Sequence, residues 1–200
     1  MFLAGLDWPD QARRGTCRAE WPFGVQGVPW GVWVRMAARP HIYSGQGFSL
    51  QRDKNRFVLP AQFRGTLKES SGRAVLCLAK HDRWKCLTGF GLSRVDEFEE
   101  MIRLEQSYAV QSGKEFDKDK RSMDLYGFHE VPFDGSGRFV LPDALVTTAN
   151  IGNQLYFHGA GSFFTAWNPD ELSTMGDGWE SAQAMCASLS AKELAKAGKK

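Results

Sequence analysis

Short apolar runs alternate with polar turns along most of the chain, and one of these runs occurs twice. The residues Arg-Phe-Val-Leu-Pro stand at 56–60 and again at 138–142. Such an ungapped repeat is not expected by chance in a chain of 200 residues, so we infer two copies of one structural unit. A polar turn precedes each copy, at 52–55 and at 134–137, and ends in Asn or Gly. Because these residue types tolerate a left-handed backbone, each turn is predicted to lead directly into the strand that its arginine begins.

The same order of elements is predicted beyond each repeated proline. Proline suits the first turn of a helix, because its missing N–H would have no partner there. Short helices are therefore expected from Ala61 and from Asp143, and two apolar runs follow each of them. The predicted strands cover 74–78, 84–88, 154–157 and 163–166. The pattern is strand, turn, strand, short helix, strand, strand, and it occurs twice.

A longer helix is predicted after each unit. Ser93 with Asp96 three residues later forms a capping-box pattern ahead of apolar residues at helical spacing. Asn168 with Pro169 next to it, and Glu171 at the third position, is a second helix start. Each unit is thus β-β-α-β-β followed by a helix.

These elements predict an α+β fold in five segments. A single unit is near the size at which a lone hydrophobic core is marginal, so the two units are expected to share one core. The expected segments are a disordered or mis-assigned N-terminal extension (1–40), a first unit (41–92), a helix and charged linker (93–126), a second unit (127–172), and a C-terminal helix with a basic tail (173–200).

Charge and composition narrow the classes of function. The net charge is only +2, so any binding of nucleic acid depends on where the charges are placed rather than on their sum. The four cysteines lack metal-ligand or redox spacing, and we expect them to be reduced in a cytoplasmic setting. No apolar run approaches the roughly eighteen residues of a membrane helix. We therefore expect neither a cofactor nor a membrane partner.

The two turns carry the candidate chemistry. A hairpin tip can enter the major groove of DNA, and arginine can pair two donors with guanine there. The first turn offers Arg52, Lys54 and Arg56 against one acid, Asp53, whereas the second offers only Arg138 against one acid. An arginine beside a turn aspartate can also be a salt bridge that merely shapes the hairpin, and the sequence leaves that alternative open.

Residues of this kind resemble a known family. A turn with a basic residue, then Arg, a short apolar strand, Pro and a short helix is the mark of the SpoVT-AbrB type of DNA-binding domain. Two such units in tandem, each followed by a helix, resemble the MraZ family of bacterial regulators. The resemblance covers roughly residues 41–172, and residues 59–64 match the family's step from strand to helix.

The resemblance implies both a fold and a function. The fold would be two AbrB-like swapped-hairpin units sharing one pseudo-two-fold core. The function would be sequence-specific regulation of transcription, through repeated short boxes in the promoter of the division and cell-wall gene cluster, with repression of the chain's own operon. The partners would be double-stranded DNA and further copies of the chain in a ring, on the nucleoid in the cytoplasm.

The resemblance also assigns roles to particular residues. By position, Arg56 and Arg138 would be the DNA-contacting arginines, with Lys54 beside the first. Arg52 stands where the family usually has the turn aspartate, and we add it to the site from its charge. Arg64 is expected to pair on its own helix rather than to contact phosphate.

Other functions were weighed against DNA binding. An enzyme is not expected, because the four histidines have no companion at metal spacing and the chain shows neither a nucleophile elbow nor a glycine-rich phosphate loop. A toxin-neutralising AbrB-like protein uses one such unit and a disordered tail, so two units and long helices argue against it. A ring-forming protein that binds a protein partner instead of DNA stays open, because the net charge is low and the second turn has no lysine.

Overall fold

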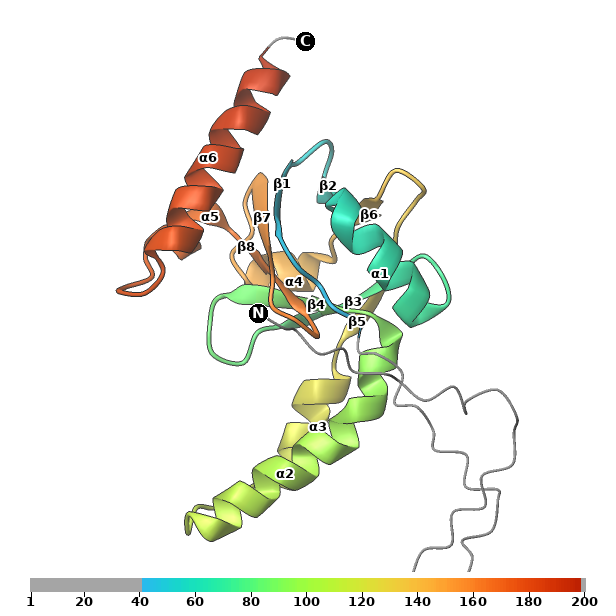
Figure 1. The fold of residues 1–200 in the computed structure, drawn as a ribbon, viewed down its shortest axis with the longest axis vertical. Coiled ribbons are helices and arrows are strands. Elements are labelled where there is room, and N and C mark those ends of the chain that lie inside the picture. Colours follow the sequence, from blue (N-terminus) through green and yellow to red (C-terminus); the bar gives the residue numbers. More distant parts are fainter. Residues whose placement is uncertain (1–40, 199–200) are drawn as a thin grey trace, which may run out of the picture. The chain divides into compact units, whose positions relative to one another are not determined.

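The computed structural model describes residues 41–198, which form an α+β fold built on antiparallel strands (Figure 1). The strands are β1 (Gln46–Leu50), β2 (Arg56–Val58), β3 (Val75–Lys80), β4 (Cys86–Phe90), β5 (His129–Pro132), β6 (Arg138–Val140), β7 (Gln154–Gly159) and β8 (Phe164–Trp167). The helices are α1 (Ala61–Ser71), the 3₁₀ helix η1 (Leu92–Glu97), α2 (Phe98–Gln111), α3 (Lys118–Tyr126), α4 (Asp143–Thr148), α5 (Pro169–Ser173) and α6 (Glu180–Ala197). The predicted N-terminal extension, 1–40, lies outside the described residues.

The predicted order of elements is present twice, as β1-β2-α1-β3-β4 and as β5-β6-α4-β7-β8. One sheet has the strand order β1-β7-β8-β4-β3-β5, and β2 pairs with β6 in a second, two-stranded sheet. The counterparts in the two units are β1 and β5, β2 and β6, β3 and β7, and β4 and β8. If each strand is replaced by its counterpart, the order of the large sheet is reversed and every strand pairing is retained. The first strand of each unit therefore pairs in the other unit, β1 with β7 and β5 with β3.

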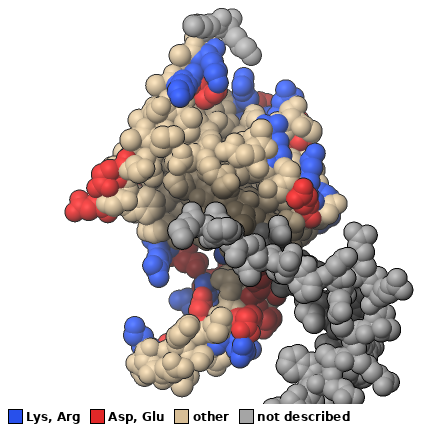
Figure 2. All heavy atoms as spheres, viewed as in Figure 1, with Lys and Arg blue, Asp and Glu red and all other residues tan. Residues whose placement is uncertain are grey.

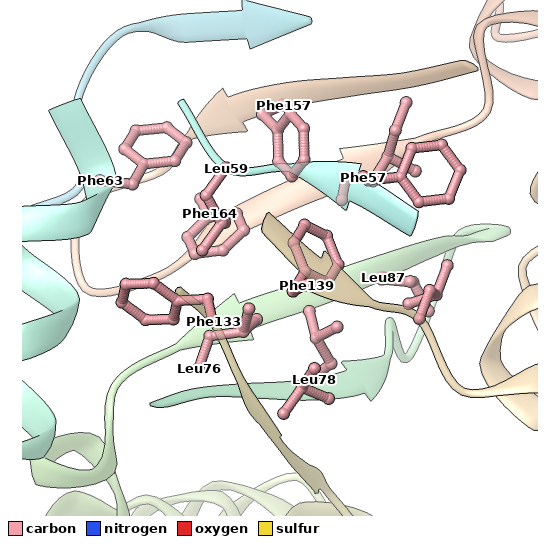
Figure 3. Close-up of a cluster of buried hydrophobic side chains, with 14 of the residues drawn as sticks. Phe57, Leu59, Phe63, Leu76, Leu78, Leu87, Phe133, Phe139, Phe157 and Phe164 are labelled. Atoms are coloured by element: carbon pink, nitrogen blue, oxygen red, sulfur yellow. The ribbon is translucent and has the colours of Figure 1, made fainter. Parts of the chain in front are cut away.

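Both units contribute to one hydrophobic core, as the sequence predicted. In β2 and β6 the middle residue points inward, so Phe57 and Phe139 lie opposite each other with ring centroids 6.3 Å apart. Burial of one such side chain contributes about 1.5–3 kcal/mol to stability. Figure 3 shows the two rings among apolar side chains from both units. The labelled members are Phe57, Leu59, Phe63, Leu76, Leu78, Leu87, Phe133, Phe139, Phe157 and Phe164.

Each short helix begins directly after its proline, as predicted. Helix α1 follows Pro60 and buries Phe63 and Leu67, which stand one turn apart on the face that meets the core. It ends at Gly72, whose φ of 65° is the left-handed conformation that glycine adopts without a steric penalty. Helix α4 follows Pro142 in the same way.

The helix start predicted at Ser93 is wrong. Residues 92–97 form the 3₁₀ helix η1, and α2 begins only at Phe98. The Ser93 hydroxyl makes no cap, because its Oγ lies 2.6 Å from Oγ of Ser70 on α1 and hydrogen-bonds there. A tertiary contact has replaced the local capping bond.

The helix start predicted at Asn168 is confirmed, although the helix is short. The side-chain oxygen of Asn168 accepts a hydrogen bond of 3.1 Å from the backbone N–H of Asp170 and so caps α5. The long C-terminal helix, α6, is separate and begins at Glu180. Within residues 41–198, no helix has both the length and the apolar character needed to cross a bilayer.

Candidate nucleic-acid interface

The first turn joins β1 to β2 and is closed by two backbone hydrogen bonds. The N–H of Arg52 donates to the carbonyl of Arg56 at 2.9 Å, and the N–H of Arg56 donates to the carbonyl of Asp53 at 2.9 Å. Asn55 ends the turn with a φ of 55°, in the left-handed region that the sequence predicted there.

The second turn joins β5 to β6 and shares the first of these two bonds, whereas the donor and the acceptor of its second bond each lie one residue earlier in the turn. The N–H of Asp134 donates to the carbonyl of Arg138 at 3.0 Å, and the N–H of Gly137 donates to the carbonyl of Asp134 at 2.9 Å. Gly137 has a φ of 81° and so corresponds to the asparagine that ends the first turn. Arg52 and Asp134 likewise occupy equivalent positions.

Each turn is tied to a strand end of the other unit. The N–H of Leu59 donates to the carbonyl of Gly137 at 2.8 Å, and the N–H of Leu141 donates to the carbonyl of Asn55 at 2.8 Å. These two bonds are equivalent under exchange of the units. They hold both turns against the same two-stranded sheet, β2–β6.

The two predicted arginines share the outer face of this sheet. Arg56 lies opposite Val140 and Arg138 lies opposite Val58, while the phenylalanine between each pair points into the core. The side chain of Arg56 is 48% exposed, and that of Arg138 is 60% exposed. Both arginines line one surface groove of ≈ 350 Å³ together with Pro132. The structure therefore brings together two residues that are far apart in the sequence.

The turn aspartates hold these arginines only loosely. Nη1 of Arg56 is 4.0 Å from Oδ2 of Asp53, and Nη1 of Arg138 is 3.8 Å from Oδ2 of Asp134. Both distances exceed a hydrogen bond, and exposed ion pairs of this kind contribute about 0.2–1 kcal/mol. The salt bridges that the sequence left open do exist, but they leave both guanidinium groups accessible.

The two turns differ in how their aspartates are used. Oδ1 of Asp134 accepts hydrogen bonds from the backbone N–H of Arg138 at 2.9 Å and of Ser136 at 2.8 Å. These bonds lower the pKa of the Asp134 carboxyl below its ordinary value. In the first turn, Oδ1 of Asp53 accepts from the N–H of Lys54 at 2.8 Å. The second turn is thus braced by a carboxylate where the first presents the exposed Arg52.

The expected ion pair of Arg64 on its own helix is wrong. Nε and Nη2 of Arg64 both donate to the carbonyl of Leu59, at 2.9 and 2.8 Å. A side chain on Gly137 would collide with this guanidinium, because an added Cβ would lie 2.2 Å from Nε of Arg64. Sequence reasoning missed this contact between the units. The available signal was the glycine at position 137, which stands where the first unit has Asn55 and leaves room for a side chain of the other unit.

The charge around the turns is mixed but locally basic. Figure 2 shows Lys and Arg side chains along the edge of the molecule that carries the β1–β2 and β5–β6 turns, with a few carboxylates among them. Arg52 and Lys54 are both exposed at the tip of the first turn. In the part of the chain that the structure describes, no cluster of three or more His, Cys, Asp or Glu side chains could hold a metal ion.

Comparison with known proteins shows relatives of this chain. It matches no family model. It is 30% identical to the transcriptional regulator MraZ of Rhodospirillum rubrum over an aligned region of 120 residues. This region is 60% of this chain and 74% of that protein. It is 28% identical to the MraZ of Rickettsia akari and 27% identical to that of Rickettsia bellii, again over 60% of this chain and over 76% and 75% of theirs.

The names of these relatives define a class of protein, the regulators of transcription. Within that class the chain belongs to the MraZ family, as the repeated motif suggested.

Proposed function

We propose that this chain represses its own operon, the division and cell-wall gene cluster, by binding repeated short boxes in the promoter. One observation carries the proposal: Arg56 and Arg138 stand on one exposed face, at equivalent positions of two units, with their guanidinium groups accessible. A symmetric pair of arginines suits the major groove, where arginine distinguishes guanine from the other bases.

The topology supports the fold on which this proposal depends. We interpret residues 41–92 and 127–172 as two SpoVT-AbrB units whose hairpins are swapped about a pseudo-two-fold axis. The exchange of β1 and β5 between the units, and the pairing of β2 with β6, are what such an arrangement requires. It presents two turns from one rigid core rather than from two separate domains.

The residues of the turns have different tasks. Arg56 and Arg138 read base edges, because each begins a strand that is anchored in the core. Lys54 and Arg52 contact phosphates, because they lie at the exposed tip of the first turn. Phosphate contacts position a protein on DNA, whereas base contacts specify the sequence. The second turn has no lysine, so it assists the first.

Several copies of the chain act together in this proposal. A homo-oligomeric ring on the nucleoid, in the cytoplasm, would present many turns to a row of short boxes. Linked binding sites raise the effective local concentration, so weak single contacts add up to tight binding. The low net charge of +2 then favours specific over non-specific binding, because the latter depends mainly on positive charge.

The test is fluorescence anisotropy of a labelled duplex from the chain's own promoter, compared with a scrambled duplex, at several salt concentrations. Arg56→Ala should weaken specific binding by about 1–3 kcal/mol. Lys54→Ala should weaken binding to both duplexes and lower the salt slope by about 1. Arg103→Ala, which removes an exposed arginine of α2 outside both turns, is the matched control.

Equal affinity of the Arg56 variant and the unmodified chain would remove the turn from the site. Equal and weak affinity for both duplexes would favour the ring-forming or toxin-neutralising alternative. Light scattering with and without the promoter duplex measures the number of subunits.

A further inference from the structure

A cavity of ≈ 120 Å³ lies between the β3–β4 hairpin and the helical segment η1–α2–α3. Its apolar wall consists of Phe90, Phe98, Met101, Leu125 and Phe163. A closed cavity of about 150 Å³ accommodates one benzene-sized molecule, so this smaller cavity, which is partly open to solvent, takes a single small ring or a branched apolar group with one end toward the opening. The DNA-binding turns contribute no residue to this cavity.

One cation of the cavity lacks the partners that a buried charge needs. Nε and Nη1 of Arg94 are buried and have no hydrogen-bond partner among residues 41–198. The guanidinium carbon lies 4.5 Å from the ring centre of Phe163 and 5.5 Å from that of Phe90. The aromatic faces attract the cation but accept no conventional hydrogen bond. Arg94 as a whole is half-buried, and a partly desolvated charge in this setting is stabilised by a counter-ion.

The other arginine of the cavity, Arg121, has carboxylate partners for its guanidinium group. Arg121 donates to Glu105 at 2.7 Å and to Asp82 at 2.8 Å, so its charge is already neutralised. Nε and Nη1 of Arg94 have no such partner in the described part of the chain, and burial lowers the pKa of Arg94, an effect that the nearby carboxylates of Glu97 and Asp82 only partly oppose. The cavity thus contains one occupied and one available guanidinium.

A water molecule beside Arg94 would not remove the difference in charge compensation between Arg94 and Arg121. A second void, of ≈ 10 Å³, is lined by Arg94, Ser70 and Tyr43, whose hydroxyl is also buried without a partner. That volume holds about one water molecule, which could bridge the hydroxyl and a guanidinium nitrogen. A water is neutral, so the positive charge beside the larger cavity would remain.

We propose that the cavity binds a small carboxylic acid with an aromatic or compact apolar body. The carboxylate pairs with Arg94, and the body packs against Phe98 and Leu125. A charge-assisted hydrogen bond between guanidinium and carboxylate is roughly twice as strong as a neutral one, which makes an acid a better ligand than a neutral compound of the same shape. This ligand site goes beyond the proposed DNA binding and shares no residue with it.

Benzoate is the probe, because it combines one ring with one carboxylate, and benzyl alcohol is its neutral counterpart. Isothermal titration should show benzoate binding roughly tenfold or more tightly than benzyl alcohol. Arg94→Met, which keeps an unbranched apolar stem but removes the charged guanidinium group, should reduce benzoate affinity by a similar factor. Arg103→Met, an exposed arginine of α2 outside the cavity, should leave it unchanged.

Leu125→Trp is a second variant, which fills the cavity and keeps the charge, and it should abolish benzoate binding. Benzoate should also raise the thermal midpoint of the unmodified chain but not that of the Leu125 variant. Equal affinity for benzoate and benzyl alcohol, or no benzoate binding to the unmodified chain, overturns the proposal. Promoter binding by the Arg94 variant should be unchanged, so this site and the DNA site can fail separately.

Discussion

The last residue of each turn has a left-handed backbone conformation, which sets the direction of the arginine that follows it. Asn55 does this in the first turn and Gly137 in the second. The two positions are not equally tolerant. The asparagine lies partly exposed and its side-chain amide donates to the carboxylate of Asp143, whereas the glycine is buried against the guanidinium of Arg64. A side chain can be accepted at the first position but not at the second.

Gly137→Ala should therefore destabilise the protein by about 1–3 kcal/mol, because alanine is strained at a φ of 81° and its Cβ would displace Arg64. Urea denaturation measures the change. Gly135→Ala is the control, since an added Cβ at Gly135 meets nothing within 4 Å, and it should change the stability by less than about 0.5 kcal/mol. Equal effects of the two substitutions would contradict this account of the turn.

At the scale of elements, the two hairpins are equivalent in topology but differ in what stabilises their turns. The β5–β6 turn is stabilised by the carboxylate of Asp134, which accepts hydrogen bonds from the backbone N–H groups of Arg138 and Ser136. The β1–β2 turn has Arg52 at the position equivalent to Asp134, so it lacks these two hydrogen bonds and carries a positive charge there. The first hairpin therefore carries more positive charge, whereas the carboxylate at the first position of the second turn accepts two backbone hydrogen bonds.

This difference predicts a pH dependence confined to the β5–β6 turn. The folded structure lowers the pKa of Asp134, so its stabilisation is fully present above the ordinary aspartate pKa and is lost as the pH falls through the lowered value. Carboxyl-carbon NMR should show Asp134 titrating below an ordinary aspartate. The protection of the Ser136 and Arg138 amides against exchange, measured relative to their intrinsic exchange rates, should fall over the same acidic range. Asp134→Ala should abolish the pH dependence, and exchange at both amides that stays slow in this variant would contradict the prediction.

At the scale of the whole molecule, the units cannot be separated into independent domains. Strand β1 completes its pairing only with β7, and β5 only with β3. The core also places Phe57 of one unit against Phe139 of the other. Unfolding of either unit therefore removes hydrogen bonds and buried apolar surface from its partner, which makes the described fold cooperative.

Fragments 41–126 and 127–198, produced separately, should each lack a cooperative thermal transition. Mixing the two should restore one, because each fragment supplies the pairing strand that the other lacks. Circular dichroism and differential scanning calorimetry follow both properties, with the intact chain as the reference. Cooperative unfolding of either fragment alone, near the midpoint of the intact chain, would show that a single unit is self-sufficient.

Much of the local structure was predictable because it depends on neighbours in the chain. The repeated Arg-Phe-Val-Leu-Pro run, the turn before it and the helix after its proline are all short-range features. The cap at Asn168 is equally local, and it is confirmed. The cap at Ser93 failed because a distant hydroxyl, that of Ser70, competes for the same group.

The sequence by itself determined that two similar β-β-α-β-β units exist, that they need a common core, and which arginines begin the repeated strands. These properties follow from periodicity, turn chemistry and repetition. Only the tertiary structure decided that the first strand of each unit pairs in the other unit, that Arg56 and Arg138 line one groove, and that Arg64 lies against the opposite turn at Gly137. Contacts between residues so far apart in the chain arise from packing in three dimensions, and no local pattern encodes which partner each will find.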